Sequence, residues 1–213
     1  MRVRVERKST LRYHERMSEA PLPMREHALD NLRFIREAME RAGSFTSIPG
    51  WGGVCVGVTA IAATAIAQQF LGRSLRLWLA TWLSEAVVAA LIGFGAMAIK
   101  ARRSDEAFMS GASRRFFVSY FAPLVAGAVV TVALVRVESY AAIPATWLLL
   151  YGTAFVSSGA FSIRVIPAMG IAFMLLGSVA SFLPLGTSNI LLGVGFGGLH
   201  ILFGLIIARS YGG

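Results

Sequence analysis

Charge, cysteine and histidine are all scarce in this sequence of 213 residues. Charged residues make up 15% of it, whereas roughly a quarter is typical of soluble domains. A single cysteine, Cys55, excludes an intrachain disulfide and a cysteine-based metal site. Three histidines, one of them inside an apolar run, offer too few ligands for a bis-histidine haem or a catalytic zinc ion within a membrane. We therefore expect no metal site, no cofactor and no catalytic centre of these kinds.

Long apolar runs dominate the rest: 56% of the residues are hydrophobic, and the mean hydropathy is +0.66. Each run holds about the twenty residues that a helix needs to cross roughly 30 Å of hydrocarbon. Open strands are excluded, because their unpaired backbone groups would face lipid. The expected spans are 51–70, 77–99, 116–135, 140–160, 165–183 and 189–208. The sequence thus predicts an all-α membrane domain, a bundle of six transmembrane helices over residues 51–208.

A polar, charge-rich segment, residues 1–48, precedes the bundle. Within it, residues 24–42 are predicted to form an amphipathic helix, because Leu32, Ile35 and Met39 recur at helical spacing along one stripe. We interpret this segment as a helix that lies on the membrane or against the cytoplasmic face of the bundle. The alternative is that the stripe is a dimer seam or docks a soluble cytoplasmic partner.

The basic residues predict the orientation. If the N-terminus is inside, 17 of the 20 Lys and Arg residues lie in inner segments, and Arg73, Arg76 and Arg136 remain outside. An excess of Lys and Arg marks cytoplasmic loops. Both termini are therefore expected in the cytoplasm. The same placement assigns the net charge of +9 to topology rather than to nucleic-acid binding.

One acidic residue, Glu85, lies near the middle of the second span. A carboxylate at mid-bilayer costs a few kcal/mol on insertion scales, so such residues usually face a cavity or a partner. Thr81 lies one turn before it and Ser84 is adjacent, which predicts a polar stripe. The alternative is a hydrogen-bonded Glu85 that only joins two helices.

The first span carries a second polar stripe, Thr64 and Gln68, near its outer end. The two stripes together predict an outward-facing polar cleft, bordered by Trp78 and Trp82. His200, in the last span, lies at a depth similar to that of Glu85. We expect the two to meet as a coupled pair that holds or relays one proton. The alternative is a structural His200 that hydrogen-bonds a backbone carbonyl.

Glycine pairs at GxxxG spacing occur in the first and last spans, as Gly53 with Gly57 and Gly193 with Gly197. Such pairs let helix backbones approach closely. We expect them to pack helices within the chain, with a homo-oligomer interface as the alternative.

Two blocks of the sequence, ALDNLRFIREAMERAGSFTSIPGWGG and FGGLHILFGLIIARSYGG, resemble those of an uncharacterised group of bacterial six-span membrane proteins. The resemblance extends from about Ala28 onward. It implies a multi-pass protein of the bacterial inner membrane, and it brings no activity, ligand or site residue with it.

These patterns favour a non-catalytic membrane protein that binds a small solute or a proton in the polar cleft, for transport or sensing. One alternative is a scaffold whose N-terminal helix recruits a soluble partner. The other is an intramembrane enzyme, which is disfavoured because Ser158 lies at the inner end of its span whereas His200 lies near the middle. A nucleophile and its base must be within hydrogen-bonding reach.

Overall fold

A computed structural model describes residues 29–32, 35, 45–103 and 111–211, and divides the chain into two units, 1–43 and 44–213. In the first unit, residues 29–32 and 35 are helical, and Leu32 and Ile35 are exposed. The rest of the predicted helix 24–42, Met39 included, lies outside the described residues.

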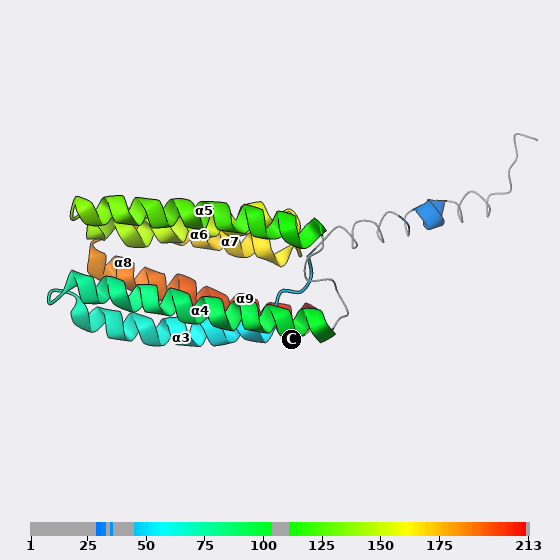
Figure 1. Cartoon of the computed structure of the whole chain (residues 1–213), viewed down its shortest axis with the longest axis horizontal. Helices are drawn as coiled ribbons and strands as arrows, with labels where there is room; N and C mark the ends of the chain where they lie inside the picture. The colour runs from blue at the N-terminus through cyan, green and yellow to red at the C-terminus, as the bar shows by residue number, and fades with distance from the viewer. Residues whose placement is uncertain (1–28, 33–34, 36–44, 104–110, 212–213) are drawn as a thin grey trace, which may run out of the picture. The chain divides into compact units, whose positions relative to one another are not determined.

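The described part of the second unit is helical apart from short connections and one isolated bridge (Figure 1). Its elements are α3 (Gly50–Phe70), α4 (Leu75–Arg103), α5 (Gly111–Arg136), η1 (Tyr140–Ala142), α6 (Ile143–Gly159), α7 (Val165–Ala180), α8 (Leu185–Leu192), η2 (Gly193–Leu199) and α9 (His200–Tyr211). The last three form one continuous rod, because η2 is a π-helical stretch between two α-helices. The predicted all-α fold is confirmed for these residues.

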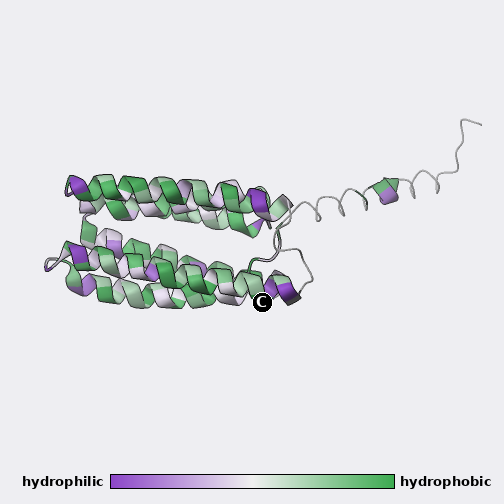
Figure 2. Ribbon diagram, viewed as in Figure 1, coloured by the Kyte–Doolittle hydropathy of each residue, from purple (hydrophilic) through white to green (hydrophobic). Residues whose placement is uncertain are grey.

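Five helices of the described chain are long and apolar enough to cross a membrane. They are Gly50–Phe70, Leu75–Arg102, Gly111–Arg136, Tyr140–Gly159 and Leu185–Tyr211. Hydrophilic residues are concentrated at the helix ends (Figure 2). The predicted span 165–183 is shorter than expected, since α7 ends at Ala180 and a turn follows before Pro184. The chain is a helical, multi-pass membrane protein.

Several spans extend beyond their predicted ends. α4 runs on through Lys100 to Arg103, and α5 already begins at Gly111. Hydropathy marks only the part of a helix that is apolar, whereas Lys and Arg are good helix formers that continue the same helix into water. The predicted limits at 99 and 116 were therefore the limits of the apolar stretch.

The helices of the second unit form two groups (Figure 1). In the first, α3 packs between α4 and the rod α8–η2–α9; in the second, α6 packs between α5 and α7. The rod also contacts α6 and α7, which joins the groups on one side. On the other side, α4 and α5 are edge helices, each packed mainly on one neighbour of its own group.

Glycine allows the closest helix contacts. A Cβ added to Gly57 of α3 would lie 2.6 Å from the carbonyl oxygen of Gly197 in η2, and one on Gly53 would lie 3.4 Å from the Cα of Gly204. Gly193 meets the side chain of Thr64 instead. Of the four GxxxG glycines, only Gly57 and Gly197 thus face each other, and all four lie at contacts between helices within the chain.

One end of the bundle is held by Lys100. Its Nζ donates hydrogen bonds to the carbonyl oxygens of Ile48 and Tyr211, both at 3.0 Å. These bonds connect the end of α4 to the beginning of α3 and the end of α9. We call this the Lys100 end.

Residues 45–49 join the two helix groups at the Lys100 end. The backbone N–H of Phe45 donates to the carbonyl of Phe161 at 2.7 Å, and the Ser162 hydroxyl donates to the carbonyl of Phe45 at 2.7 Å. The Phe45 ring is buried 4.9 Å from the ring of Phe116, measured between centroids. The segment before α3 is therefore anchored on the α6–α7 connection and on α5.

Candidate functional site

A cavity of about 340 Å³ lies between the two helix groups. Every span contributes to its lining, which is mainly aliphatic and aromatic. Its rings include those of Trp78, Trp82, Phe117, Tyr120, Tyr151 and Phe196. Among the described residues that line it, Glu85 supplies a carboxyl group and His200 an imidazole. Small-molecule sites in proteins have this character, an apolar concavity with a few placed polar groups.

Glu85 reaches the cavity from α4 and is 9% exposed. The Thr59 hydroxyl donates a hydrogen bond to its Oε1 at 2.9 Å, across the α3–α4 contact. The same hydroxyl lies 2.9 Å from the carbonyl oxygen of Val56 in its own helix. Glu85 thus has a partner on a neighbouring helix, as the burial of a carboxyl group in a membrane requires. No pattern in the sequence indicates Thr59 as this partner.

The other two members of the predicted stripe around Glu85 form hydrogen bonds within their own helix. Thr81 donates to the carbonyl of Leu77, and Ser84 donates to the carbonyl of Thr81, both within α4. Neither lines the cavity, and Ser84 is exposed. Adjacent residues of an α-helix are about 100° apart around its axis. Ser84 therefore points away from the face that carries Glu85.

The remaining predicted polar residues meet at the far end of the bundle, around Asn189 of α8, which is completely buried. The indole N–H groups of Trp78 and Trp82 both donate to its Oδ1, at 2.9 Å each. Its Nδ2 donates to Gln68 Oε1 at 2.7 Å and to the carbonyl of Thr64 at 3.4 Å. Because an indole N–H can only donate, the two tryptophans fix the orientation of the amide.

This Asn189 cluster corrects the predicted cleft. Thr64, Gln68, Trp78 and Trp82 do come together, but each of them is hydrogen-bonded to Asn189 rather than facing an open polar cleft. Thr64 takes part through its backbone carbonyl, because its hydroxyl donates to the carbonyl of Ala60. Asn189 was expected only as the first residue of a span. The sequence does carry one signal for it. Thr64 with Gln68, and Trp78 with Trp82, are each spaced i,i+4, so each pair lies on one helix face and can reach a shared partner.

His200 begins α9, directly after the π-helical stretch, and is 6% exposed. Its Nε2 lies 3.0 Å from the Tyr151 hydroxyl of α6. Its ring stacks on that of Phe196, with centroids 6.1 Å apart and 15° between the planes. Nδ1 is buried beside the η2 carbonyls, without a well-formed hydrogen bond to a described residue. π-Helical turns in α-helices are frequent at functional sites.

Glu85 and His200 line the same cavity, but their hydrogen-bond partners are different. Thr59 of α3 binds Glu85, and Tyr151 of α6 is the partner of His200. No hydrogen bond therefore joins these two described residues in the predicted pair. A hydroxyl from a neighbouring helix contacts Glu85 Oε1 and another contacts His200 Nε2 instead.

Comparison with known proteins gives no match to a family model, to a curated protein or to a solved structure. Among the described residues, no group of three or more His, Cys, Asp or Glu side chains could hold a metal ion.

The Thr59–Glu85 bond should be measurable by a double-mutant cycle. Thr59→Val removes the hydroxyl at nearly constant volume, and Glu85→Leu removes the carboxyl group. Side-chain hydrogen bonds in membranes average about 0.6 kcal/mol and reach about 1.7 kcal/mol. We expect a coupling free energy in that range from unfolding in mixed micelles, and Glu85→Gln should retain most of it because an amide still bonds a hydroxyl. A coupling of zero would show that the two side chains do not interact.

Proposed function

We propose that this protein is a non-catalytic membrane protein that binds a small, largely apolar molecule between its two helix groups, for transport or sensing. The observation that carries the proposal is the cavity of about 340 Å³ with its aromatic lining. Glu85 and the His200–Tyr151 pair supply polar groups to orient one polar end of the ligand. This ligand class is narrower than the small solute or proton expected from the sequence, and the apolar lining of the cavity is the reason for narrowing it.

We further propose six crossings of a bacterial inner membrane, with the Lys100 end in the cytoplasm. The orientation is supported by the distribution of Lys and Arg. The sixth crossing would be α7, whose 16 residues rise about 24 Å at 1.5 Å per residue. A helix a few ångströms short of the hydrocarbon thickness is accommodated by local thinning of the bilayer.

Gly93 offers a way to fill the cavity without a clash. It lines the cavity from α4, and a Cβ added there would meet no atom within 4 Å. The probe is a decanol that carries a diazirine, added to the protein in phosphatidylcholine nanodiscs and activated by light. We expect adducts on Trp78 and Ala60, which line the cavity and are 0% exposed. Gly93→Phe should reduce these adducts by about tenfold or more, because the added ring would occupy space that the ligand needs, and a tenfold loss corresponds to only about 1.4 kcal/mol of binding free energy.

Gly198 of η2 provides the control. It also lies within a long apolar helix, it is exposed, and a Cβ added there meets no atom within 4 Å, but it lines neither the cavity nor the surface of α4. Gly198→Phe should leave the adducts on Trp78 and Ala60 unchanged. Equal losses in both variants, or adducts confined to exposed side chains, would contradict binding in the cavity.

A further inference from the structure

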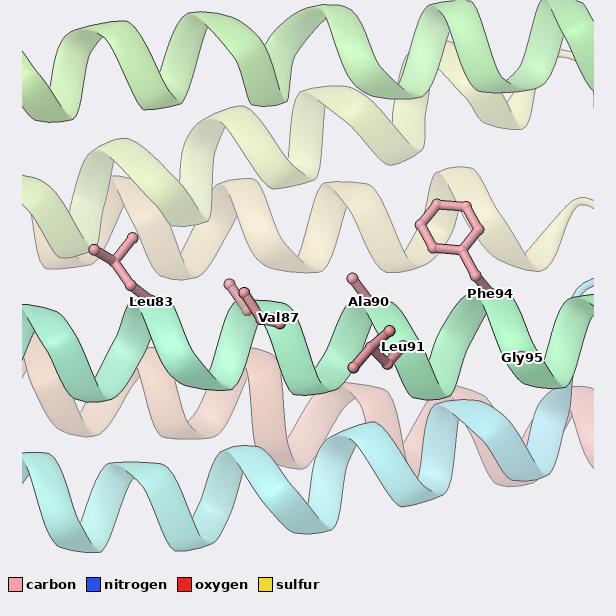
Figure 3. A pocket seen from close by; sticks show the side chains of 7 residues that line it. Leu83, Val87, Ala90, Leu91, Phe94 and Gly95 are labelled. Carbon is pink, nitrogen blue, oxygen red and sulfur yellow. The ribbon is translucent and has the colours of Figure 1, made fainter.

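The outer face of α4 carries an apolar groove that continues into the cavity. Seven residues line the groove, all of them apolar, and four of these also line the cavity. The four are Leu83, Ala86, Ala90 and Phe94. Leu83, Ala90 and Phe94 project from α4 toward the helices of the other group (Figure 3). At the outer side of the groove, Leu91 is 71% exposed, so the groove opens onto the surroundings of the bundle.

The groove lies where the two groups are joined by side chains rather than by packed helices. α4 packs on α3, and α5 packs on α6. Between α4 and α5, the Phe94 ring stacks on Phe121 at 5.9 Å and lies 6.1 Å from Phe117, measured between centroids. All three rings line the cavity. We call these three residues the phenylalanine gate, because side chains change rotamer far more easily than helices separate.

Other contacts occupy both ends of the cavity. Trp78 and Trp82 line it at one end, and both are bound to the buried Asn189. Ile48 and Pro49 line it at the Lys100 end, where Lys100 holds the Ile48 carbonyl. A ligand that came along the bundle axis would have to break buried hydrogen bonds. The gap between α4 and α5 requires only that phenyl rings move.

We propose that this gap is a lateral portal, through which a single-chain amphiphile passes from the bilayer into the cavity. The inference rests on the proposed function, and it adds the ligand class and the route. Since α4 is one of the membrane-spanning helices, hydrocarbon covers its outer groove, and a water-soluble ligand would find no polar group there. The hydrocarbon chain then occupies the aromatic cavity, and its polar end hydrogen-bonds Glu85 or His200.

A reversible cross-link across the gate tests this route. In a Cys55→Ser background, Phe94→Cys and Phe121→Cys are bridged by a short bis-methanethiosulfonate reagent, in phosphatidylcholine nanodiscs. The diazirine decanol is added after cross-linking, and adducts on Trp78 and Ala60 are measured by mass spectrometry. We expect these adducts to be lost in the bridged protein, down to the level of the Gly93→Phe variant, and to return when the bridge is reduced.

A second cysteine pair controls for the chemistry. Val125 and Val129 lie one turn apart on α5 and are 62% and 66% exposed, so a bridge between them does not cross the gap. Bridging them should leave the cavity adducts unchanged. If the Phe94–Phe121 bridge also leaves them unchanged while Gly93→Phe still abolishes them, the portal is wrong and the cavity site stands. If no state of the protein gives cavity adducts, both proposals are overturned.

Discussion

Replacing Asn189 with leucine should lower the free energy of unfolding by about 2–4 kcal/mol, because four hydrogen bonds inside the membrane domain disappear at once. Leucine has the same branched arrangement of side-chain heavy atoms, so it keeps the shape of the side chain while it removes the amide. The indole N–H groups of Trp78 and Trp82 would remain buried without an acceptor, which adds a desolvation cost. Unfolding in mixed micelles, followed by tryptophan fluorescence and circular dichroism, would measure the loss.

A double-mutant cycle between Trp82 and Asn189 provides the control, because it isolates the hydrogen bond between them. Trp82→Phe removes one of the four bonds and should cost about 0.6–1.7 kcal/mol. In the Asn189→Leu background the same substitution should cost almost nothing, because the N–H group that it removes already lacks a partner. Equal costs in both backgrounds, or an Asn189→Leu variant as stable as the parent, would show that the cluster does not hold α4, α3 and α8 together.

A methyl group at Gly152 should destabilise the second helix group by about 1–3 kcal/mol. A Cβ added there would lie 2.6 Å from the carbonyl oxygen of Gly170 and 2.9 Å from the backbone nitrogen of Met174. Both are backbone atoms, so α6 and α7 must move apart along their whole contact. Because helix association in lipid depends on van der Waals contact, that separation loses stability that no hydrophobic effect restores. Unfolding of Gly152→Ala in mixed micelles measures the loss.

Gly198 distinguishes steric conflict from the general effect of replacing glycine in a helix. It is exposed, and a Cβ added there meets no atom within 4 Å. Gly198→Ala should therefore be neutral or slightly stabilising. If Gly152→Ala and Gly198→Ala have the same stability, the close approach of α6 to α7 is not present in solution.

The transmembrane helices could be predicted from the sequence because a helix satisfies its own backbone, so length and hydropathy alone identify a span. This holds for α3, α4 and α5, whose apolar stretches were placed correctly. It fails at α7, where the apolar run continues through Phe182 but the helix ends at Ala180. Hydropathy records which residues tolerate lipid, and it does not record where the backbone turns.

The polar contacts could not be predicted, because periodicity places a residue on a face without naming what faces it. Glu85 could be identified because a carboxyl group in the middle of a bilayer has a high free-energy cost. Its partner Thr59, however, lies 26 residues earlier on another helix. Asn189 lies 111 residues from Trp78. The cavity was missed for a related reason: Tyr120, Tyr151 and Phe196 have the composition of any lipid-facing or packed helix. Only the arrangement of the helices makes them the walls of one cavity.

An experimental density map of the full chain in nanodiscs that contain the decanol probe would test the account most directly. We predict elongated density that begins between α4 and α5, passes Phe94 and ends within hydrogen-bonding distance of Glu85 or His200. A map in which α4 packs directly on α5 and side chains fill the space between the two helix groups would contradict it.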